Sequence, residues 1–146
     1  MHAKIFIALL FFAVQVEGSS LHLTNWAGRY PSSSDKGFRN VFEVPEVKKA
    51  LDKLLTRSER KLLTRTYAVV TPIQLIQGHL VVQCCKPHCC PCEHAMLVVD
   101  LQREVFHVGF YEGYEGKTII KWVSSEGEFL DLPKDIRDEF YHGHRA

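Results

Sequence analysis

The stretch HLVVQCCKPHCCPCEHAMLVVDL, residues 79–101, decides the fold of this chain. It contains two β-branched, apolar runs, HLVVQCC (79–85) and AMLVVDL (95–101), separated by a loop rich in cysteine and proline. Runs of this kind, bounded by turn residues, predict β-strands. The connection is too short for the crossover that parallel strands need, so the two strands are expected to run antiparallel. The cysteine-rich segment is therefore predicted to be the tip of a β-hairpin.

Three more runs of β-branched and aromatic residues extend the predicted sheet. They are TYAVVT (66–71), EVFHVGFY (104–111) and KTIIKWVSS (117–125). Turns with Gly, Pro and charged residues separate the runs, which predicts an antiparallel meander. Large side chains of the last two strands are expected in the core or on a sheet face: Phe106, Phe110, Ile119, Ile120 and Trp122. Tyr111 and Tyr114 are expected at a turn.

Helical signals lie before and after these strands. Pro45 suits the first turn of a helix, and apolar residues follow it at helical spacing to about Thr56. Ser58 is expected to cap a short second helix. A last short helix is predicted from Leu132 to Tyr141.

The composition fits a single domain. The chain has 146 residues, of which 46% are hydrophobic and 24% are charged, as in ordinary globular proteins. We predict one α+β domain, an antiparallel sheet of about five strands with flanking helices. The net charge of +1 provides no overall field for nucleic acid. Acidic residues gather in the segment 112–139, so steering toward a basic partner would require this segment to lie beside the loop.

The N-terminal sequence MHAKIFIALLFFAVQVEGSS is typical of a secretory signal peptide. Its apolar run, Ile5 to Val14, is shorter than the roughly 20 residues that span a bilayer. We predict a signal peptide at residues 1–18, a mature domain at 19–146, and no membrane segment after cleavage. Export favours disulfides between nearby cysteines, and five cysteines leave at least one unpaired in a monomer.

All five cysteines fall within residues 84–92, and the first hypothesis for them is a zinc site. Zinc binds Cys and His side chains at short spacings, but structural sites normally draw a second pair of ligands from a separate segment. The candidate ligands are Cys85, His88, Cys89 and Cys92, with His94 or His107 as possible additions.

The second hypothesis is redox chemistry, because Cys89 to Cys92 has the CxxC form. A CxxC thiol is activated at a helix N-terminus, whereas here a predicted strand follows. A Cys89–His107 nucleophile pair would need an activating geometry, and clustered cysteines of an exported protein are more often oxidised. Neither alternative favours an enzyme.

The third hypothesis is a display loop. A disulfide between Cys85 and Cys90 would close a six-residue loop in which Pro87 fixes the backbone just before His88. Such a loop is already held in its bound shape, so it loses less entropy on association. His88 would stand at its apex.

The sequence CKPHCC, residues 85–90, resembles the CKPHDC loop of the inhibitor of vertebrate lysozyme (Ivy) family. The setting is similar too, with a signal peptide, helices, a strand, the loop, and then the aliphatic strand HAMLVVD. The likeness extends from about Phe42 to the C-terminal region. The fold it implies is an antiparallel sheet flanked by helices.

The resemblance implies a periplasmic or secreted bacterial protein that binds c-type lysozyme and plugs the active-site cleft with this loop. His88 would carry the inhibition, Cys85 and Cys90 would form the supporting disulfide, and Lys86 and Pro87 would shape the loop. The protein would be no enzyme and would need no cofactor or metal. Because the family includes dimers, a homodimer is a possible assembly. The alternative is a small exported zinc-binding domain that uses the Cys84–His94 cluster.

The chain departs from the family pattern in its cysteines. Cys89 stands where the family has Asp, which removes a hydrogen-bond acceptor from the loop. Cys84 and Cys92 flank the loop, so that Cys84–Cys92 and Cys89–Cys92 pairings both stay open. A remaining cysteine could bridge two subunits.

Overall fold

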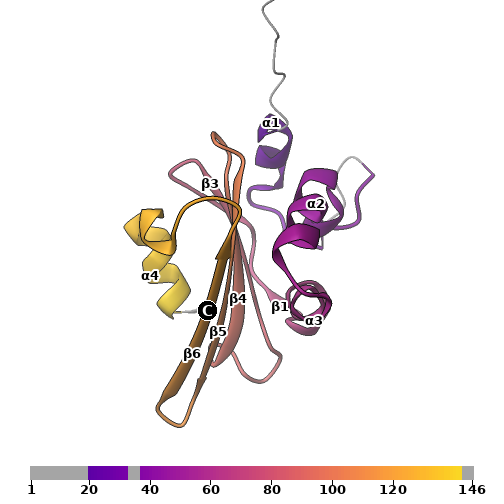
Figure 1. The fold of residues 1–146 in the computed structure, drawn as a ribbon. Coiled ribbons are helices and arrows are strands. Elements are labelled where there is room, and N and C mark those ends of the chain that lie inside the picture. The colour runs from indigo at the N-terminus through magenta and orange to yellow at the C-terminus, as the bar shows by residue number, and fades with distance from the viewer. Residues whose placement is uncertain (1–19, 33–36, 143–146) are drawn as a thin grey trace, which may run out of the picture.

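A six-stranded antiparallel sheet with helices on both faces forms the protein (Figure 1). The computed structural model describes residues 20–32 and 37–142. The predicted signal peptide, residues 1–18, lies outside the described residues. The structure confirms the predicted class, one α+β domain with an antiparallel sheet.

The strands pair in the order β1-β3-β4-β5-β6, and β2 also pairs with β3. Consecutive strands from β3 to β6 form the predicted meander. Their bounds are β1 (Val69–Val70), β2 (Gln74–Ile76), β3 (His79–Cys85), β4 (Glu93–Asp100), β5 (Val105–Tyr114) and β6 (Lys117–Ser124).

Helices cover the two faces of the sheet unequally. One face packs against the N-terminal helices, and the other packs against the C-terminal helix α4 (Figure 1). The bounds are α1 (Ser20–Leu23), η1 (Thr24–Trp26), η2 (Val41–Glu43), α2 (Pro45–Leu54), α3 (Arg57–Lys61), η3 (Leu62–Thr66), η4 (Phe129–Asp131) and α4 (Lys134–His142).

Both faces of the central strands are buried, which explains why their sequences are continuously apolar. Leu80, Val82 and Leu97 face the N-terminal helices. Val81 and Met96, which point to the opposite face, pack in a second cluster with α4. The sheet is therefore the middle layer of three.

The cysteine-rich loop and the β5–β6 turn lie at the same end of the sheet. The β3–β4 ladder runs to the pair Cys85↔His94, where the cysteine-rich loop begins, and the β5–β6 ladder ends at Tyr114↔Lys117. In Figure 1 the two turns lie together at the lower end. The predicted hairpin is confirmed, with the cysteine-rich segment at its tip.

Several sequence predictions are wrong in detail. The run 66–71 forms only the two-residue strand β1, because its first residue ends η3 and Pro72, which lacks a backbone donor, follows directly. The cap of α3 is Thr56 and not Ser58. Thr56 and Glu59 form a capping box in which each side chain accepts from the other's backbone N–H.

The positions expected on the last two strands divide into buried and exposed sets. Phe106 and Phe110 are buried, whereas Ile119 and Ile120 are 64% and 41% exposed. They lie near the turn end of the edge strand β6, which has a neighbouring strand on only one side. Tyr111 lies within β5 rather than at a turn.

Gly109 provides the flat surface on which α4 docks. A Cβ at this position would overlap the ring of Trp122 and would lie 2.6 Å from Phe140 Cε2. These two rings also contact each other, with centroids 5.3 Å apart. The absence of a side chain at Gly109 therefore lets a strand, an edge tryptophan and the C-terminal helix meet.

We expect Gly109→Ala to lower the free energy of unfolding by about 1–3 kcal/mol, because the added methyl group overpacks this contact. Urea denaturation followed by tryptophan fluorescence would measure the loss. The control is Gly113→Ala in the same strand, where the nearest atom is Cε1 of the half-buried Tyr111 side chain, at 2.9 Å. Equal losses in the two variants would contradict the assignment.

Candidate functional site: the β3–β4 loop

The tip of the hairpin is a tight turn over residues 86–89. The backbone N–H of Cys89 donates to the carbonyl of Lys86 at 3.0 Å. Pro87 occupies the second position of this turn, and His88 occupies the third with φ +63°. Proline second and a positive φ third are the features of a type II turn. Pro87 is thus a residue expected at the second position of this turn, whereas His88 is not a residue expected at the third position.

The backbone of His88 lies in the left-handed region, which most turns of this type fill with Gly or Asn. For a residue with a Cβ this conformation costs about 1–2 kcal/mol. The His88 side chain is exposed and gains no burial that would offset the cost. Backbone strain of this kind is concentrated at functional sites, which makes the imidazole of His88 a candidate functional group.

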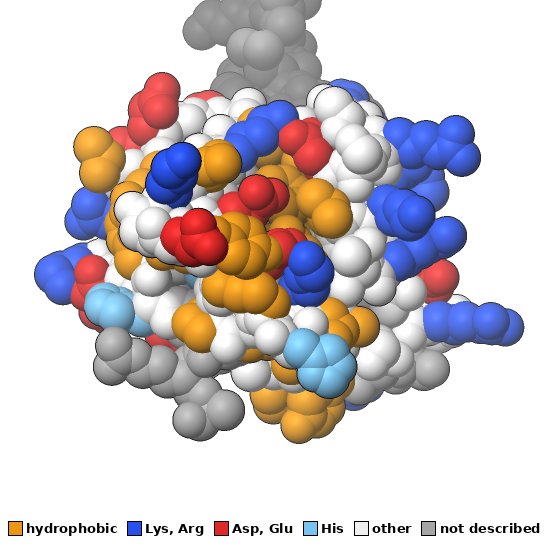
Figure 2. Space-filling view, turned by 90° about the horizontal axis from the view of Figure 1, so that it is seen from below, with side chains coloured by type: hydrophobic (Ala, Val, Ile, Leu, Met, Phe, Trp, Pro, Cys, Tyr) orange, Lys and Arg blue, Asp and Glu red, His pale blue; other side chains and the backbone are white. Residues whose placement is uncertain are grey.

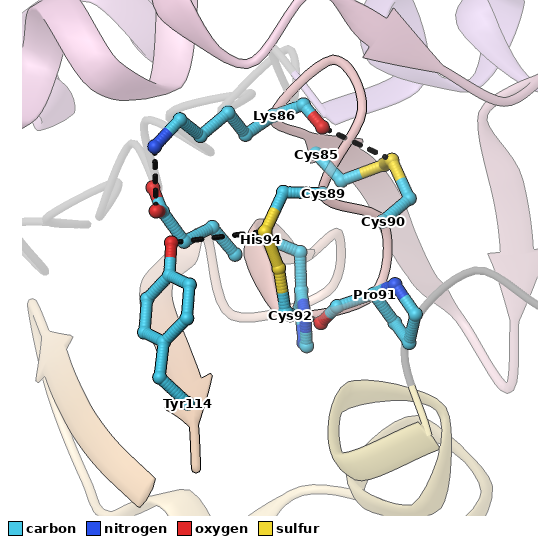
Figure 3. The surroundings of a disulfide bond; sticks show 9 residues. Cys85, Lys86, Cys89, Cys90, Pro91, Cys92, His94 and Tyr114 are labelled. Atoms are coloured by element: carbon cyan, nitrogen blue, oxygen red, sulfur yellow. Dashed lines mark hydrogen bonds and ion pairs between the residues drawn. A yellow bond between two sulfur atoms is a disulfide. The ribbon is translucent and has the colours of Figure 1, made fainter.

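Two disulfides hold the loop (Figure 3). Cys85 pairs with Cys90, with Cα atoms 5.5 Å apart, and this bond closes the six-residue loop around His88. Cys89 pairs with Cys92 at a Cα separation of 5.2 Å. Of the two further pairings left open by the sequence, the structure contains Cys89–Cys92.

Polar contacts tie the loop to the sheet below it. Lys86 Nζ forms an ion pair with Glu93 Oε1 at 2.6 Å, and the Lys86 backbone N–H donates to the Glu93 carbonyl at 2.9 Å. The Gly113 N–H in β5 donates to the Cys92 carbonyl at 2.8 Å. The Tyr114 hydroxyl donates to Sγ of Cys89 at 3.7 Å (Figure 3). The loop is therefore braced from both β4 and β5.

His94, at the start of β4, braces the loop from beneath. Its Nδ1 lies 2.8 Å from the Pro91 carbonyl oxygen, and its Nε2 lies 2.7 Å from the Phe140 carbonyl oxygen in α4. The ring is 4% exposed and stacks on Tyr111 with centroids 4.6 Å apart. The C-terminal helix and the cysteine-rich loop are thus both in contact with the same buried imidazole.

Cys84 is the free cysteine, and it lies in the core below the loop. Its thiol is within 3.5 Å of the Leu63 carbonyl and 3.8 Å of the Ala95 carbonyl. Burial raises the pKa of the Cys84 thiol to about 12. A thiol so placed stays protonated near neutral pH and cannot reach a second subunit without unfolding.

These positions remove the basis of the zinc and redox hypotheses in the described part of the chain. Four cysteines are in disulfides and the fifth is buried, so the cluster offers no accessible thiolate. Within residues 20–32 and 37–142, no group of three or more His, Cys, Asp or Glu side chains is arranged to hold a metal ion. The Cys89–Cys92 pair precedes a strand and not a helix.

The structure does not bring Cys89 and His107 together. His107 pairs with Ser124 toward the opposite end of the sheet, and its Nδ1 contacts the Ser124 hydroxyl. Burial lowers the pKa of His107. The nucleophile pair, which the sequence analysis did not favour, is therefore not formed.

The sequence prediction named the loop residues Cys85, Lys86, Pro87, His88 and Cys90, and the structure places all of them in one tip. It missed the residues that brace this tip: Glu93, Gly113 and Tyr114, together with the bracing role of His94. Glu93 could have been found by counting back along the hairpin from Cys85↔His94. Gly113 and Tyr114 depend on the β4–β5 register, which no local signal sets.

The described part of the chain carries one loop that two disulfides hold at the end of an antiparallel sheet. The chain matches the family model described as Inhibitor of vertebrate lysozyme (Ivy) over residues 46–142. This match covers more than half of the chain, and the chain belongs to the Ivy family, whose members are non-enzymatic inhibitors of lysozyme.

Comparisons beyond the family model add nothing further. No curated protein and no solved structure matches the chain. Within the described residues, no helix is both long and apolar enough to cross a membrane.

We expect the native protein to show no thiol that reacts with Ellman's reagent at pH 8, because the Cys84 thiol is buried and protonated. After denaturation in guanidinium without a reductant, one thiol per chain should react, since the two disulfides persist. A chelator should change neither result. More than one thiol in the denatured chain, or thiols released by the chelator, would contradict the disulfide assignment.

Proposed function

We propose that this chain is an exported inhibitor of c-type lysozyme that inserts the loop from Cys85 to Cys90 into the active-site cleft, with His88 leading. Lys86 and Pro87 shape the loop, and the Cys85–Cys90 disulfide holds it closed. The observation that carries the proposal is the exposed imidazole of His88 on a strained turn between two disulfides.

The chemistry of lysozyme suits such a loop. The enzyme uses two carboxyl groups flanking the scissile bond, one protonated and one ionised. An imidazole between them can donate to the carboxylate through one nitrogen and interact with the acid through the other. The loop would also exclude sugar and water, and any ion pair formed there would be strengthened by the closed cleft.

Rigidity is what makes this loop suited to inhibition. A free loop would lose conformational entropy on entering the cleft, whereas this loop is held in one shape by covalent bonds and by the sheet. Pro87 and His88 at its apex are exposed, so the apex is accessible to a concave site on a partner.

Export fits the same proposal. The predicted signal peptide at residues 1–18 would direct the chain to the periplasm or the medium, where disulfides form and persist. A homodimer, if it forms, would be non-covalent, because the free thiol of Cys84 is buried.

We expect His88→Asn to abolish most inhibition of a c-type lysozyme while leaving the thermal unfolding midpoint nearly unchanged. Asn tolerates the left-handed backbone at this position but lacks an imidazole. Lysis of bacterial cell walls at low and moderate salt would measure inhibition.

His88→Ala should give the same loss of inhibition with a somewhat lower stability. His142→Ala removes another exposed histidine, in α4, and should inhibit like the wild type. If the wild type fails to inhibit, the target is wrong; if His88→Asn inhibits fully, the role of His88 is wrong.

The disulfides give a second test of the display loop. We expect Cys85→Ser with Cys90→Ser to lower the free energy of unfolding by about 2 kcal/mol, the loop-closure value for six residues. The inhibition constant should rise as well, because the loop must then be ordered on binding.

Cys84→Ser is a matched control for the loss of a sulfur atom outside the loop. It should lower stability by burying a hydroxyl while keeping the inhibition constant of the folded protein. An unchanged inhibition constant in the double serine variant would argue against preorganisation.

A further inference from the structure

The two disulfides of the loop differ in what surrounds their sulfur atoms. Cys85, at the end of β3, is fully buried, whereas its partner Cys90 is exposed. Cys89 and Cys92 are both partly exposed and lie outside the strands. Figure 2 shows this end of the molecule, at which hydrophobic side chains, cysteine among the types so coloured, reach the surface between charged ones. Both cysteines of the second disulfide thus have surface in contact with solvent.

The reduction of a disulfide depends on the sulfur atom that leaves. A thiolate attacks one sulfur, and the other sulfur departs with the electron pair of the broken bond as a second thiolate. The bond opens faster where hydrogen-bond donors or water stabilise this departing charge. The surroundings of each sulfur therefore indicate which bond opens first and in which direction.

Cys89 has a donor that can stabilise a departing thiolate. The Tyr114 hydroxyl lies 3.7 Å from Sγ of Cys89 (Figure 3), and it is the donor because a sulfur in a disulfide carries no hydrogen. This weak contact becomes a charge-assisted hydrogen bond once Cys89 carries a negative charge. Among the described residues, no hydrogen-bond donor contacts Sγ of Cys92. Attack on Cys92 with departure of Cys89 is therefore the favoured direction.

The Cys85–Cys90 bond has the opposite surroundings. Attack on the exposed Cys90 would expel a thiolate at Cys85, which is 0% exposed, and an uncompensated buried charge is costly. Attack on Cys85 is hindered by its burial and would place the charge on Cys90, whose Sγ lies 3.5 Å from the Lys86 carbonyl oxygen. Neither direction stabilises the departing thiolate, so this bond resists reduction.

We propose that the Cys89–Cys92 disulfide is a thiol–disulfide exchange site, and that its opening by a dithiol reductant lowers the affinity of the loop for its target. A thiolate of the reductant attacks Sγ of Cys92, the bond to Cys89 breaks, and Cys89 leaves as a thiolate that takes up a proton. The second thiol of the reductant then attacks the reductant's own sulfur in the mixed disulfide and releases Cys92. The protein bond gains two electrons, and the reductant becomes a disulfide. The exchange site is independent of the proposed function, whereas its effect on inhibition rests on that function.

This role differs from that of a redox enzyme with a CxxC motif. Such an enzyme needs a thiolate that is activated at a helix N-terminus, but the strand β4 follows Cys92 directly. The chain is therefore the substrate of the exchange and not its catalyst.

Opening this bond would loosen the turn without opening the six-residue loop. The Gly113 N–H donates to the carbonyl of Cys92 at 2.8 Å, so the disulfide ties Cys89, the last residue of the turn, to β5. The loop closed by Cys85 and Cys90 stays closed when this tie is lost. Reduction should therefore lower the affinity by lowering the order of the turn, and reoxidation should restore it.

Graded reduction of the native protein is the first test. The protein is treated with dithiothreitol for increasing times, quenched in acid, alkylated after denaturation and mapped by mass spectrometry. We expect label on Cys89 and Cys92 about tenfold sooner than on Cys85 and Cys90. The free Cys84 should be labelled in every sample and serves as the internal reference. Simultaneous loss of both bonds, or earlier loss of Cys85–Cys90, would overturn the proposal.

Tyr114→Phe tests the leaving sulfur, because it removes the hydroxyl and keeps the ring. We expect the Cys89–Cys92 bond to open several-fold more slowly in this variant. A merely structural role for Tyr114 would have the opposite effect, since a looser loop is reduced faster. The matched control is Tyr30→Phe, at another exposed tyrosine in the N-terminal part of the chain, which should leave the rate unchanged. An unchanged or faster rate in Tyr114→Phe would overturn the assignment of Cys89 as the leaving sulfur.

A monothiol identifies the attacked sulfur directly. With cysteamine in place of dithiothreitol, the mixed disulfide should form on Cys92, and Cys89 should be recovered as the alkylated thiol. Cysteamine attached to Cys89 instead would reverse the direction of the exchange and contradict the role of Tyr114.

The effect on affinity has its own test. The variant Cys89→Ser with Cys92→Ser reproduces the open state and should raise the inhibition constant for a c-type lysozyme several-fold. Wild type that is reduced at this bond, freed of reductant and reoxidised should regain its original inhibition constant. An unchanged inhibition constant in the serine variant would overturn the effect on affinity. If the wild type does not inhibit lysozyme, the proposed function falls, and the order of reduction still decides the exchange site.

Discussion

The antiparallel ladder between β3 and β4 is the constraint on which the rest of the structure depends. It runs without interruption from His79↔Asp100 to Cys85↔His94, so the loop starts from two strands that are already fixed. A shift of one residue would exchange the two faces. Cys84 would then point toward α4 and not toward the N-terminal helices, and the loop disulfide would start from the opposite side of the sheet.

The same register couples the loop to the C-terminal helix. His94 points to the face covered by α4, and there it reaches the Pro91 carbonyl above and the Phe140 carbonyl across. Both ring nitrogens of His94 therefore face a carbonyl oxygen, although a neutral imidazole has a single N–H and can donate to only one of them. The packing of Gly109 against Trp122 and Phe140 fixes the helix at the distance that this bridge needs. The position of the loop therefore depends on how α4 docks on the sheet, because His94 contacts both.

The sequence predicts those parts of the fold that depend on neighbours along the chain. The apolar runs, the hairpin tip, the start of α2 at Pro45 and the residues of the loop all follow from local patterns. The exposure of Ile119 and the bracing by Tyr114 depend on which strand lies at the edge and on how β5 aligns with β4.

The turn at His88 shows how the restraints work together. Glycine there would remove the backbone strain, but it would also remove the side chain that the loop displays. Pro87 fixes one torsion, and the two disulfides and the ladder fix the ends of the turn, so the strained conformation persists. Where the related CKPHDC loop has an acidic side chain, this chain forms a covalent bond to Cys92, which water cannot displace as it can a hydrogen bond. The loop thus depends less on solvent-exposed hydrogen bonds for its shape, and its rigidity comes mainly from the covalent frame and the sheet beneath it.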